Sequence, residues 1–380
     1  MSKLEELIQE LCPDGVRFKS IKEVYQRVKG TPITAGKMKE IENNKGDIRI
    51  FAGGKTVINA YEKDIPKANI TRVPAVLVQS RGIIDVIYYE KPFTFKNEMW
   101  AYTHQEKISV KFLYYVLKNN INKFRESASG MGSMPQISLK ITEDFKIPIL
   151  PLPIQKEIVR ILDNFTELTV ELTVELTARK KQYEYYRDNL LKTAKDTEIY
   201  YINQISENCD NQRKPVTSGN RVSGEYPYYG ASGIVDYVDD YIFDGDYLLI
   251  SEDGANLLAR STPIAFSISG KNWVNNHSHV LHFNTYETRR YIEIYLNSID
   301  LTPYITGGAQ PKLNQKNLNK IPISLPSLEE QRRIVNILDH FDKLCNDISE
   351  GLPAEIVARQ KQYEYYRDKL LTFKPLEEEK

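Results

Sequence analysis

The chain carries one helical sequence twice. Residues 155–165 read QKEIVRILDNF and residues 331–341 read QRRIVNILDHF, which are identical at seven of eleven positions. Residues 181–191 (KQYEYYRDNLL) and residues 361–371 (KQYEYYRDKLL) are identical at ten of eleven positions. Shared helix propensity does not reproduce such strings, so the sequence indicates an internal duplication in which both halves fold alike.

Both copies have the apolar period of an amphipathic helix, with steps of three and four positions. We expect residues 155–193 to form one helix about 58 Å long. Gly351-Leu352-Pro353 should interrupt the second copy, because Pro is tolerated only in the first turn of a helix. A stripe of this length needs a partner, so we predict that the two copies pair as a two-helix coiled coil. The predicted stripe consists of Ile158, Ile161, Phe165, Leu168, Leu172, Leu176, Tyr183, Tyr186, Ile334, Leu338, Phe341, Leu344, Ile348, Tyr363 and Tyr366.

The first copy contains a short repeat of its own. Residues 166–177 read TELTVELTVELT, three tetrapeptides in succession. Four residues form about one helical turn of roughly 6 Å, so adding or removing one unit would change the length of the helix and nearly keep its apolar face. The alternative interpretation is a helix-favouring stretch with no further role.

The segments outside the repeated helices have mixed character. Residues 73–78 (VPAVLV) and 247–251 (YLLIS) are typical of strands, and residues 108–124 and 288–298 are typical of helices. We therefore predict an α+β protein: two mixed α/β domains with curved, mostly antiparallel sheets, joined by two long helices in a pseudo-twofold internal repeat. The predicted boundaries are 1–150 for the first variable domain, 151–195 for the first long helix, 196–326 for the second variable domain and 327–380 for the second long helix.

The charge pattern argues against a protein held to DNA by bulk charge, because the formal net charge of the 380 residues is zero. Residues 1–150 hold 24 Lys and Arg against 17 Asp and Glu, whereas residues 196–326 hold 10 against 15. A basic face is possible in the first half. In the second half any contact with nucleic acid must be local and specific, or a partner must supply the charge.

The cysteine pattern indicates a reducing compartment. Cys12, Cys209 and Cys345 are far apart in the sequence and no CxxC pair occurs. The N-terminal residues are charged and amphipathic, unlike a signal peptide. No apolar run approaches the roughly 18 residues of a membrane span. We expect a cytoplasmic protein without a membrane partner.

No catalytic constellation is evident, and we predict no catalytic residue on this chain. Residues 51–56 (FAGGKT) resemble the end of a P-loop, but Arg49 occupies the place of its first glycine. No Pro-Pro pair exists for the loop with which an adenine methylase holds a flipped base. The C-terminal EEEK is a solvated charge run, and no pairing of an aspartate with an ExK motif suggests a nuclease.

Three histidines lie in residues 275–282 (NNHSHVLH). On the strand expected there, His277 and His279 share one face and His282 points to the other. We predict no metal site, because no Cys or carboxylate stands near them in the sequence. The imidazoles are then either structural or in contact with DNA.

The spacing IP…LP…Q..IV.ILD.F occurs at residues 147–165 and again at residues 321–341, and residues 11–16 read LCPDGV. Two variable segments, each followed by this motif and a Tyr-rich helix, resemble the specificity subunit of type I restriction-modification enzymes over the whole chain. One position departs from the family's pattern. Ile154 precedes Gln155 where the family usually has Glu, as Glu330 shows in the second copy, which puts a helix cap or a partner contact in doubt.

The resemblance implies that each variable segment is a target recognition domain that reads one half of a split sequence in double-stranded DNA. It implies that the two helices pack antiparallel and hold these domains apart. Two methyltransferase subunits would bind the helices and use S-adenosylmethionine, and restriction subunits with translocase activity would join with ATP and Mg. The chain itself would be a non-catalytic subunit with no cofactor of its own.

The candidate DNA-binding residues lie in glycine-rich turns and in loops that follow strands, where a rigid sheet can present polar groups to a groove. Residues 96–100 (KNEMW) are the expected counterpart of the histidine stretch. Asn can pair with adenine and Lys with guanine, and Arg81 is the best single candidate. The candidates are Gly53, Gly54, Lys55, Ser80, Arg81, Lys96, Asn97, Trp100, Gln136, Tyr229, Ser232, Glu252, Asn256, Asn275, Asn276, His277, His279, Gln310 and Lys312.

Two alternative functions remain open from the residues alone. The first is a duplicated DNA-binding protein without enzyme partners, whose helices would still pair. The second is a coiled-coil scaffold whose variable domains bind protein, which salt-dependent retention on DNA would distinguish.

Overall fold

The structure is a computed structural model that describes residues 3–54, 56–130, 134–308 and 310–376. The chain divides into two compact units. Unit 1 is Met1–Glu171 with Ile356–Lys380, and unit 2 is Leu172–Glu355. Each unit therefore combines one variable domain with parts of both repeated segments.

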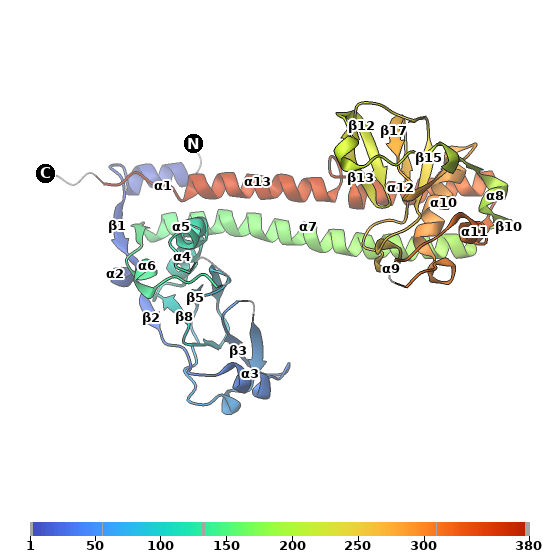
Figure 1. Cartoon of the computed structure of the whole chain (residues 1–380). Helices are drawn as coiled ribbons and strands as arrows, with labels where there is room; N and C mark the ends of the chain where they lie inside the picture. Colours follow the sequence, from blue (N-terminus) through green and yellow to red (C-terminus); the bar gives the residue numbers. More distant parts are fainter. Residues whose placement is uncertain (1–2, 55, 131–133, 309, 377–380) are drawn as a thin grey trace. The chain divides into compact units, whose positions relative to one another are not determined.

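The repeated segments are long helices, as predicted. The first copy is one continuous helix, α7 (Leu152–Thr193), and the second is two helices, α12 (Leu328–Asn346) and α13 (Leu352–Leu370), as Figure 1 shows. A Cβ atom on Gly351, just before α13, would lie 2.6 Å from the Lys343 carbonyl oxygen. Only glycine fits the turn at that distance, and the helix is interrupted there.

The two copies make reciprocal contacts. In unit 1 the Phe165 ring of α7 stacks on Tyr366 of α13, with centroids 5.5 Å apart. In unit 2 the equivalent phenylalanine, Phe341 of α12, packs 5.5 Å from Tyr186 of α7. Each copy thus supplies the phenylalanine of one contact and the tyrosine of the other, as expected for an antiparallel pair of duplicated helices.

The prediction is wrong for one residue of the stripe. The Ile348 side chain is 86% exposed, because it lies in the turn between α12 and α13 and on no helix. Ile158, Ile334 and Leu338 are buried. The remaining predicted positions are half-buried or, at Leu168, Tyr186 and Tyr366, slightly more than a third exposed.

We call β1 to β9 (residues 17–149) head 1. Its first strand pairs antiparallel with its last, and a four-stranded antiparallel sheet has the order β2-β8-β5-β6. A three-stranded sheet has the order β4-β3-β7, in which β3 and β7 are parallel. The strands are β1 (Arg17–Ser20), β2 (Gln26–Val28), β3 (Ile48–Phe51), β4 (Val57–Ala60), β5 (Ala75–Gln79), β6 (Asp85–Tyr89), β7 (Phe93–Phe95), β8 (Met99–Thr103) and β9 (Lys146–Ile149). The helices of unit 1 besides α7 and α13 are α1 (Lys3–Leu11), α2 (Ile21–Val24), α3 (Ala35–Ile41), α4 (Lys107–Asn119), α5 (Ile121–Glu126) and α6 (Leu139–Glu143), with a 3₁₀ turn η1 (Glu62–Asp64).

We call β10 to β19 (residues 198–325) head 2. Its first and last strands again pair antiparallel, and its main sheet has the order β11-β18-β15-β16. The second sheet has the order β13-β12-β17-β14, in which β12 and β17 are parallel. The strands are β10 (Glu198–Tyr201), β11 (Glu207–Asn208), β12 (Ser223–Gly230), β13 (Gly233–Val238), β14 (Phe243–Asp244), β15 (Tyr247–Ser251), β16 (Ala265–Ile268), β17 (Lys271–Val274), β18 (Ser278–His282) and β19 (Pro322–Leu325). The helices are α8 (Ile202–Ile205), α9 (Asn256–Ala259), α10 (Tyr286–Ser298) and α11 (Gln315–Leu318), with 3₁₀ turns η2 (Asp210–Gln212), η3 (Ser218–Asn220) and η4 (Thr302–Tyr304).

The two heads share one topology. Their main sheets have the same strand order, each second sheet contains one parallel pair, and β14 is an addition of head 2. The duplication therefore extends through the heads, although their sequences differ. The predicted α+β class with mostly antiparallel sheets is confirmed.

The core of each head continues into the long helix that follows it. Ile154, Ile158 and Leu162 of α7 are buried in one cluster with head 1. Ile334 and Leu338 of α12 occupy the same place against head 2. Burial of such a side chain stabilises by about 1.5–3 kcal/mol, so each head is packed firmly onto its helix.

Two local predictions need correction. The helix expected at residues 108–124 is two helices, α4 and α5, which break at Asn120. The strand expected over the histidines begins only at Ser278, so His277 lies in the preceding turn and does not share a strand face with His279. The turn is fixed by the Asn275 side-chain oxygen, which accepts a hydrogen bond from the His277 amide at 2.8 Å.

Candidate nucleic-acid interface

Turns from separate parts of the sequence meet at one end of head 1. The Lys96 amide of the β7–β8 turn donates to the Phe51 carbonyl at 2.9 Å, and the Gly53 amide donates to Glu98 Oε1 at 3.1 Å. The Gln79 side chain at the end of β5 donates to the Gly54 carbonyl at 2.6 Å. The predicted glycine turn and the predicted Lys96 turn therefore lie side by side.

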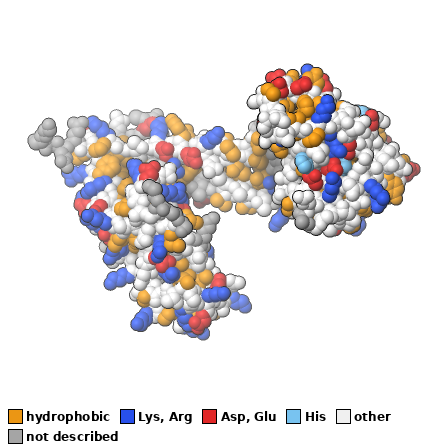
Figure 2. All heavy atoms as spheres, viewed as in Figure 1, with side chains coloured by type: hydrophobic (Ala, Val, Ile, Leu, Met, Phe, Trp, Pro, Cys, Tyr) orange, Lys and Arg blue, Asp and Glu red, His pale blue; other side chains and the backbone are white. Residues whose placement is uncertain are grey.

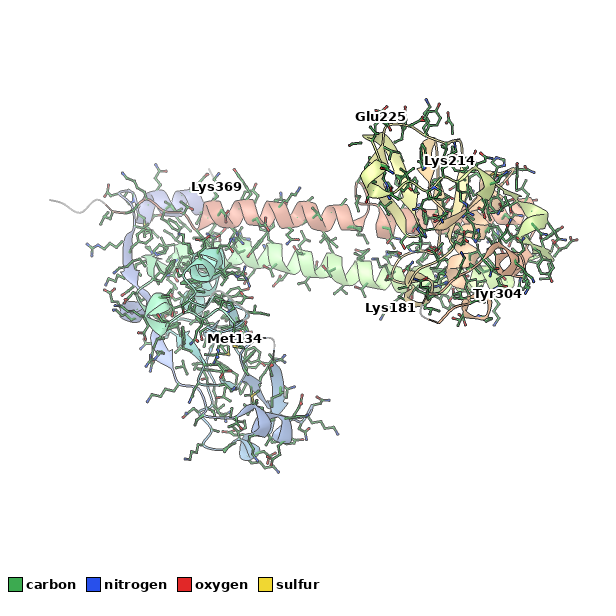
Figure 3. The ribbon with its side chains drawn as sticks, viewed as in Figure 1. Met134, Lys181, Lys214, Glu225, Tyr304 and Lys369 are labelled. Atoms are coloured by element: carbon green, nitrogen blue, oxygen red, sulfur yellow. The ribbon has the colours of Figure 1, made fainter. Side chains whose placement is uncertain are left out.

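The loop before α6 joins the same group. The Gly82 amide donates to the Pro135 carbonyl at 2.9 Å, and the Ile137 amide donates to the Ser80 carbonyl at 2.9 Å. These bonds place Arg81 opposite Gln136, and both are exposed. Figure 3 labels Met134 in this loop. Two residues predicted from distant segments thus form one polar surface.

Head 2 repeats this arrangement with different side chains. The Gly254 amide donates to the Pro311 carbonyl at 3.1 Å, and the Leu313 amide donates to the Glu252 carbonyl at 2.7 Å. Asp253 therefore stands opposite Lys312, where head 1 has Arg81 and Gln136. Asp253 lies in a loop that the sequence favours for groove reading but is not among the candidate residues, and the backbone hydrogen-bond pattern identifies it.

The turns before β8 and β18 also correspond. The Asn275 amide donates to the Tyr229 carbonyl at 3.1 Å, as the Lys96 amide does to Phe51 in head 1. The predicted equivalence of residues 96–100 with the histidine stretch is supported by this pairing. His277 is half-exposed at the tip of its turn, with Nδ1 2.9 Å from Asp253.

A charge cluster around the buried His279 supports the loops of head 2. Arg213 pairs with Glu252 at 2.7 Å and with Asp210 at 3.3 Å, and Lys312 pairs with Glu252 at 3.1 Å. His279 Nδ1 lies 2.6 Å from Asp210 Oδ2, and its Nε2 lies 2.8 Å from the Leu313 carbonyl oxygen. The cluster ties strand β18 to the loop that presents Lys312.

The same cluster overturns the premise used against a metal site. Ligand atoms of Asp210, Glu252 and His279 lie within 4.8 Å of one another, so His279 does have carboxylate neighbours. Arg213 and Lys312 already neutralise these carboxylates. Burial raises the pKa of Glu252, but the hydrogen bonds from Arg213 and Lys312 and the charge of His279 outweigh it, and the net pKa lies below its usual value.

Three predicted DNA contacts are corrected, and a fourth, at the half-buried Asn256, stays a prediction. Ser80, Asn275 and His279 are buried, so their side chains cannot reach DNA in this structure. Ser80 instead donates to the Glu98 carbonyl. The amide of Asn256 is used within its own loop, where Oδ1 accepts from Ser261 and from the Thr262 amide, and Nδ2 donates to the Thr262 carbonyl.

The other candidates divide by exposure. Trp100 is half-buried and donates its indole N–H to Thr142 at 2.8 Å, so this donor is already used within the head. Lys55 lies outside the described residues. The half-buried candidates are Gly53, Gly54, Lys96, Tyr229 and Glu252, and the exposed ones are Arg81, Asn97, Gln136, Ser232, Asn276, His277, Gln310 and Lys312. These stay predictions of DNA contact.

The surface charge is mixed. On the face shown in Figure 2, Lys and Arg side chains are scattered over unit 1, and acidic and basic side chains lie together on unit 2. No helix in the described ranges combines the length and the apolar character that a bilayer span requires. The local, loop-based interface of each head is therefore the main candidate for recognition.

Comparison with known proteins identifies the family of this chain. The family described as "Type I restriction modification DNA specificity domain" matches residues 13–179 and again residues 194–358. The chain belongs to this family of type I restriction-modification specificity subunits, with two target recognition domains.

Individual relatives agree with this assignment. A putative type I restriction enzyme specificity subunit of Haemophilus influenzae is 38% identical over 191 residues, which cover 49% of this chain and 49% of that protein. A type I restriction enzyme specificity subunit of Escherichia coli is 33% identical over 361 residues, which cover 86% of this chain and 87% of that protein. The crystal structure of the S subunit of a type I restriction-modification system from M. genitalium matches this chain with a TM-score of 0.64 at 17% identity. The match covers 94% of this chain and 96% of that chain, and it shows a shared fold.

Proposed function

We propose that this chain selects the DNA target of a type I restriction-modification complex. Each head reads one half of a split target, and the long helices set the distance between the halves. The observation that carries this proposal is a matching pair of loops in each head, which we call the loop platform: the loop after β5 or β15 together with the loop before α6 or α11. At equivalent backbone positions head 1 presents Arg81 and Gln136, and head 2 presents Asp253 and Lys312.

The difference between the platforms predicts an asymmetric target. An Arg side chain suits the acceptors of guanine, and a carboxylate suits the amino group of cytosine. Since the backbone geometry is shared and the side chains differ, the two half-sites should differ in sequence. The family match leaves the two alternatives, a DNA-binding protein without enzyme partners and a protein-binding scaffold, without support.

The test is methylome sequencing of a host that expresses this chain with its methyltransferase subunit. We expect a split target with two unlike halves and one fixed spacing. A compact palindrome would contradict the proposal.

The helices should bind one kind of partner twice. The KQYEYYRD segment occurs on α7 and on α13, and its second tyrosine is exposed by nearly the same fraction in both, 67% at Tyr185 and 63% at Tyr365. Equal exposed surfaces on duplicated helices fit two copies of a methyltransferase subunit. S-adenosylmethionine, ATP and Mg would then be held by the methyltransferase and restriction subunits.

Stoichiometry tests this part. We expect Tyr185→Ala or Tyr365→Ala to weaken one of the two methyltransferase sites, so that native mass spectrometry shows a complex with one copy instead of two. Tyr201→Ala is the control, because Tyr201 is also exposed but lies on head 2. Loss of both copies from a single substitution would contradict two separate sites.

A further inference from the structure

Each head is joined to its long helix by the same ionic arrangement. In unit 1 Asp163 Oδ2 of α7 lies 2.7 Å from Lys111 Nζ of α4, and its Oδ1 accepts from the Tyr115 hydroxyl at 2.5 Å. In unit 2 Asp339 Oδ1 of α12 lies 2.7 Å from Arg290 Nε of α10, and its Oδ2 accepts from a tyrosine hydroxyl at 2.6 Å. The two aspartates are the same residue of the ILD motif.

The heads keep this chemistry while their sequences differ. In α4 the tyrosine, Tyr115, stands four residues after Lys111. In α10 the tyrosine, Tyr286, stands four residues before Arg290. Residues four apart lie on the same face of a helix, so either order brings a cation and a hydroxyl to the same carboxylate. Each head therefore supplies a cation and a tyrosine to the long helix from a different sequence.

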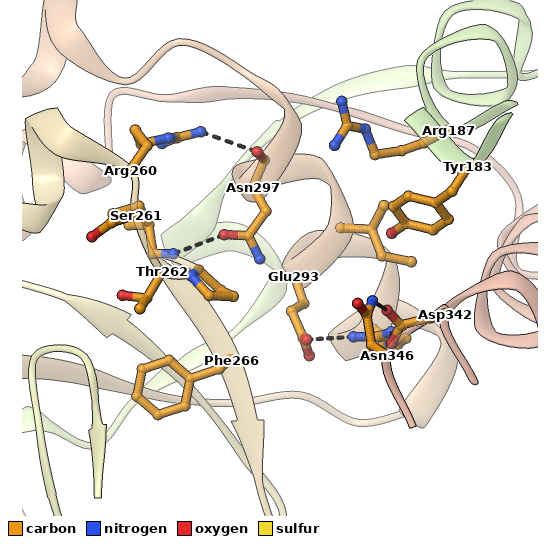
Figure 4. Close-up of a pocket in the computed structure, with 14 residues that line it drawn as sticks. Tyr183, Arg187, Arg260, Ser261, Thr262, Phe266, Glu293, Asn297, Asp342 and Asn346 are labelled. Carbon is orange, nitrogen blue, oxygen red and sulfur yellow. Dashed lines mark hydrogen bonds and ion pairs between the residues drawn. The ribbon is translucent and has the colours of Figure 1, made fainter. Parts of the chain in front are cut away.

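The surroundings of both contacts are open. Lys111, Tyr115 and Asp163 border a surface hollow of 420 Å³ in unit 1. Arg290 and Asp342 border one of 410 Å³ in unit 2, drawn in Figure 4. Close packing resists small rotations where side chains interlock, and it is absent over these hollows. Directional hydrogen bonds to an aspartate therefore restrain the angle of the head helix beside each hollow, in addition to the apolar packing elsewhere on the junction.

The two contacts are unequal. Arg290 also pairs with Asp342 at 2.9 Å and with Glu293, whereas the position equivalent to Asp342 in the first copy is Thr166. Arginine additionally offers several donors in a fixed plane, and lysine offers a single charged group. Around this aspartate, head 1 therefore has fewer directional contacts than head 2.

We propose that Asp163 with Lys111 and Asp339 with Arg290 are positioning pairs that fix the angle of each head on its long helix and so restrict the spacing between half-sites that the complex accepts. This inference rests on the proposed function. It predicts that loosening the head 1 pair widens the range of spacings and leaves the bases read by either head unchanged.

The experiment compares two lysines of α4. Lys111→Gln removes the pair between head and helix. Lys118→Gln is the matched control, because Lys118 forms a pair with Asp85 at 2.6 Å whose exposure (33% and 27%) resembles that of Lys111 and Asp163 (30% and 23%), but both partners lie within head 1. The complex of each full-length chain with its methyltransferase subunit is given DNA in which the half-sites are the cognate spacing apart or one base pair closer or farther.

We expect Lys111→Gln to lower the ratio of methylation at the cognate spacing to that at the neighbouring spacings by about three- to tenfold, the range expected for the net contribution of one ordinary intramolecular hydrogen bond. Lys111→Arg and Lys118→Gln should keep the ratio of the unmodified chain. If Lys111→Gln does not fold, Tyr115→Phe, which removes only the hydroxyl, serves as the same test.

Three results would overturn the inference: an unchanged ratio in the folded variant, an equal loss in Lys118→Gln, or a change in the bases read. If the unmodified complex methylates no split target, the proposed function itself is wrong. The two failures are therefore distinguishable.

Discussion

At the scale of single residues, the predicted recognition surface is partly correct. Arg81 and Gln136 meet, as do Lys312 and the loop after β15, because backbone hydrogen bonds join segments that are far apart in the sequence. The sequence could not show that His279 is buried against Asp210, which lies 69 residues away. Polar residues in a loop sequence do not reveal which of them satisfy buried partners and which remain for DNA.

Arg81→Ala should weaken DNA binding through head 1. Removal of a guanidinium that contacts a base costs about 1–3 kcal/mol and relaxes specificity at one position of one half-site. The measurement is binding of the complex to a set of targets with single base changes. Arg72→Ala is the control, an exposed arginine of the same head that pairs with Glu62. Equal effects of the two substitutions would remove Arg81 from the interface.

Asp210 should make the stability of head 2 depend on acid. Burial raises the pKa of this carboxyl, but hydrogen bonds from His279 and the Val280 amide, together with charge, outweigh burial, and the pKa lies below its usual 3.8. A carboxyl whose pKa is lowered by folding stabilises above its unfolded pKa, and this contribution disappears as the pH falls through the folded pKa.

We therefore expect Asp210→Asn to lower the free energy of unfolding at pH 7 by about 1–3 kcal/mol. Below pH 4 the free energy of unfolding should decrease less with falling pH in this variant than in the unmodified chain. Denaturant titrations from pH 7 to pH 3 measure both. Asp236→Asn is the comparison, because Asp236 pairs with Arg221 at a more exposed site and should cost less. A variant as stable as the unmodified chain at pH 7 would contradict the supporting role.

At the scale of elements, the helices were predictable and the heads were not. Apolar residues at steps of three and four positions occur in both copies and predicted α7 and its interrupted partner. The break near Gly351 was predicted as well. The failure at Ile348 came from extending the period into that break. In the heads, short strands with irregular turns carry no comparable period, so their order and their parallel pairs appear only in the structure.

Deletion of residues 169–172 should shorten α7 by about one turn, roughly 6 Å. Leu168, Leu172 and Leu176 stand four residues apart, so the deletion brings an equivalent leucine into each vacated place. The target spacing should fall by one or two base pairs at about 3.4 Å each. Methylome sequencing checks this, and altered half-site bases would contradict the role of α7 as the spacer.

At the scale of the whole molecule, the duplication is deeper than the matching strings. Only the helices repeat letter by letter, yet both heads have the same strand order and the same two pairs of converging loops. Backbone hydrogen bonding conserves a fold while the side chains that face a ligand change. Sequence comparison within the chain therefore detected the helices and one pair of equivalent head segments, residues 96–100 and 275–282, whereas the shared strand order of the heads appears only in the structure.

A chain with two identical heads should read a symmetric target. Replacing residues 202–321 by residues 21–145 keeps the paired strands at both ends of head 2 and inserts a second copy of head 1. Since each head reads its own half-site, we expect the first half-site twice in inverted order. Methylome sequencing decides, and persistence of the original second half-site would contradict independent reading by the heads.

The pairing of β1 with β9, and of β10 with β19, has a consequence for inheritance. Each head leaves the rest of the protein and returns to it through two adjacent strands, so both of its ends are at one place. Recombination at the two flanking coding segments can therefore exchange a complete head between genes without disturbing the helices. A bacterium in which such an exchange occurs gains a specificity subunit with a new DNA target in a single genetic event, while the other subunits of the complex stay unchanged.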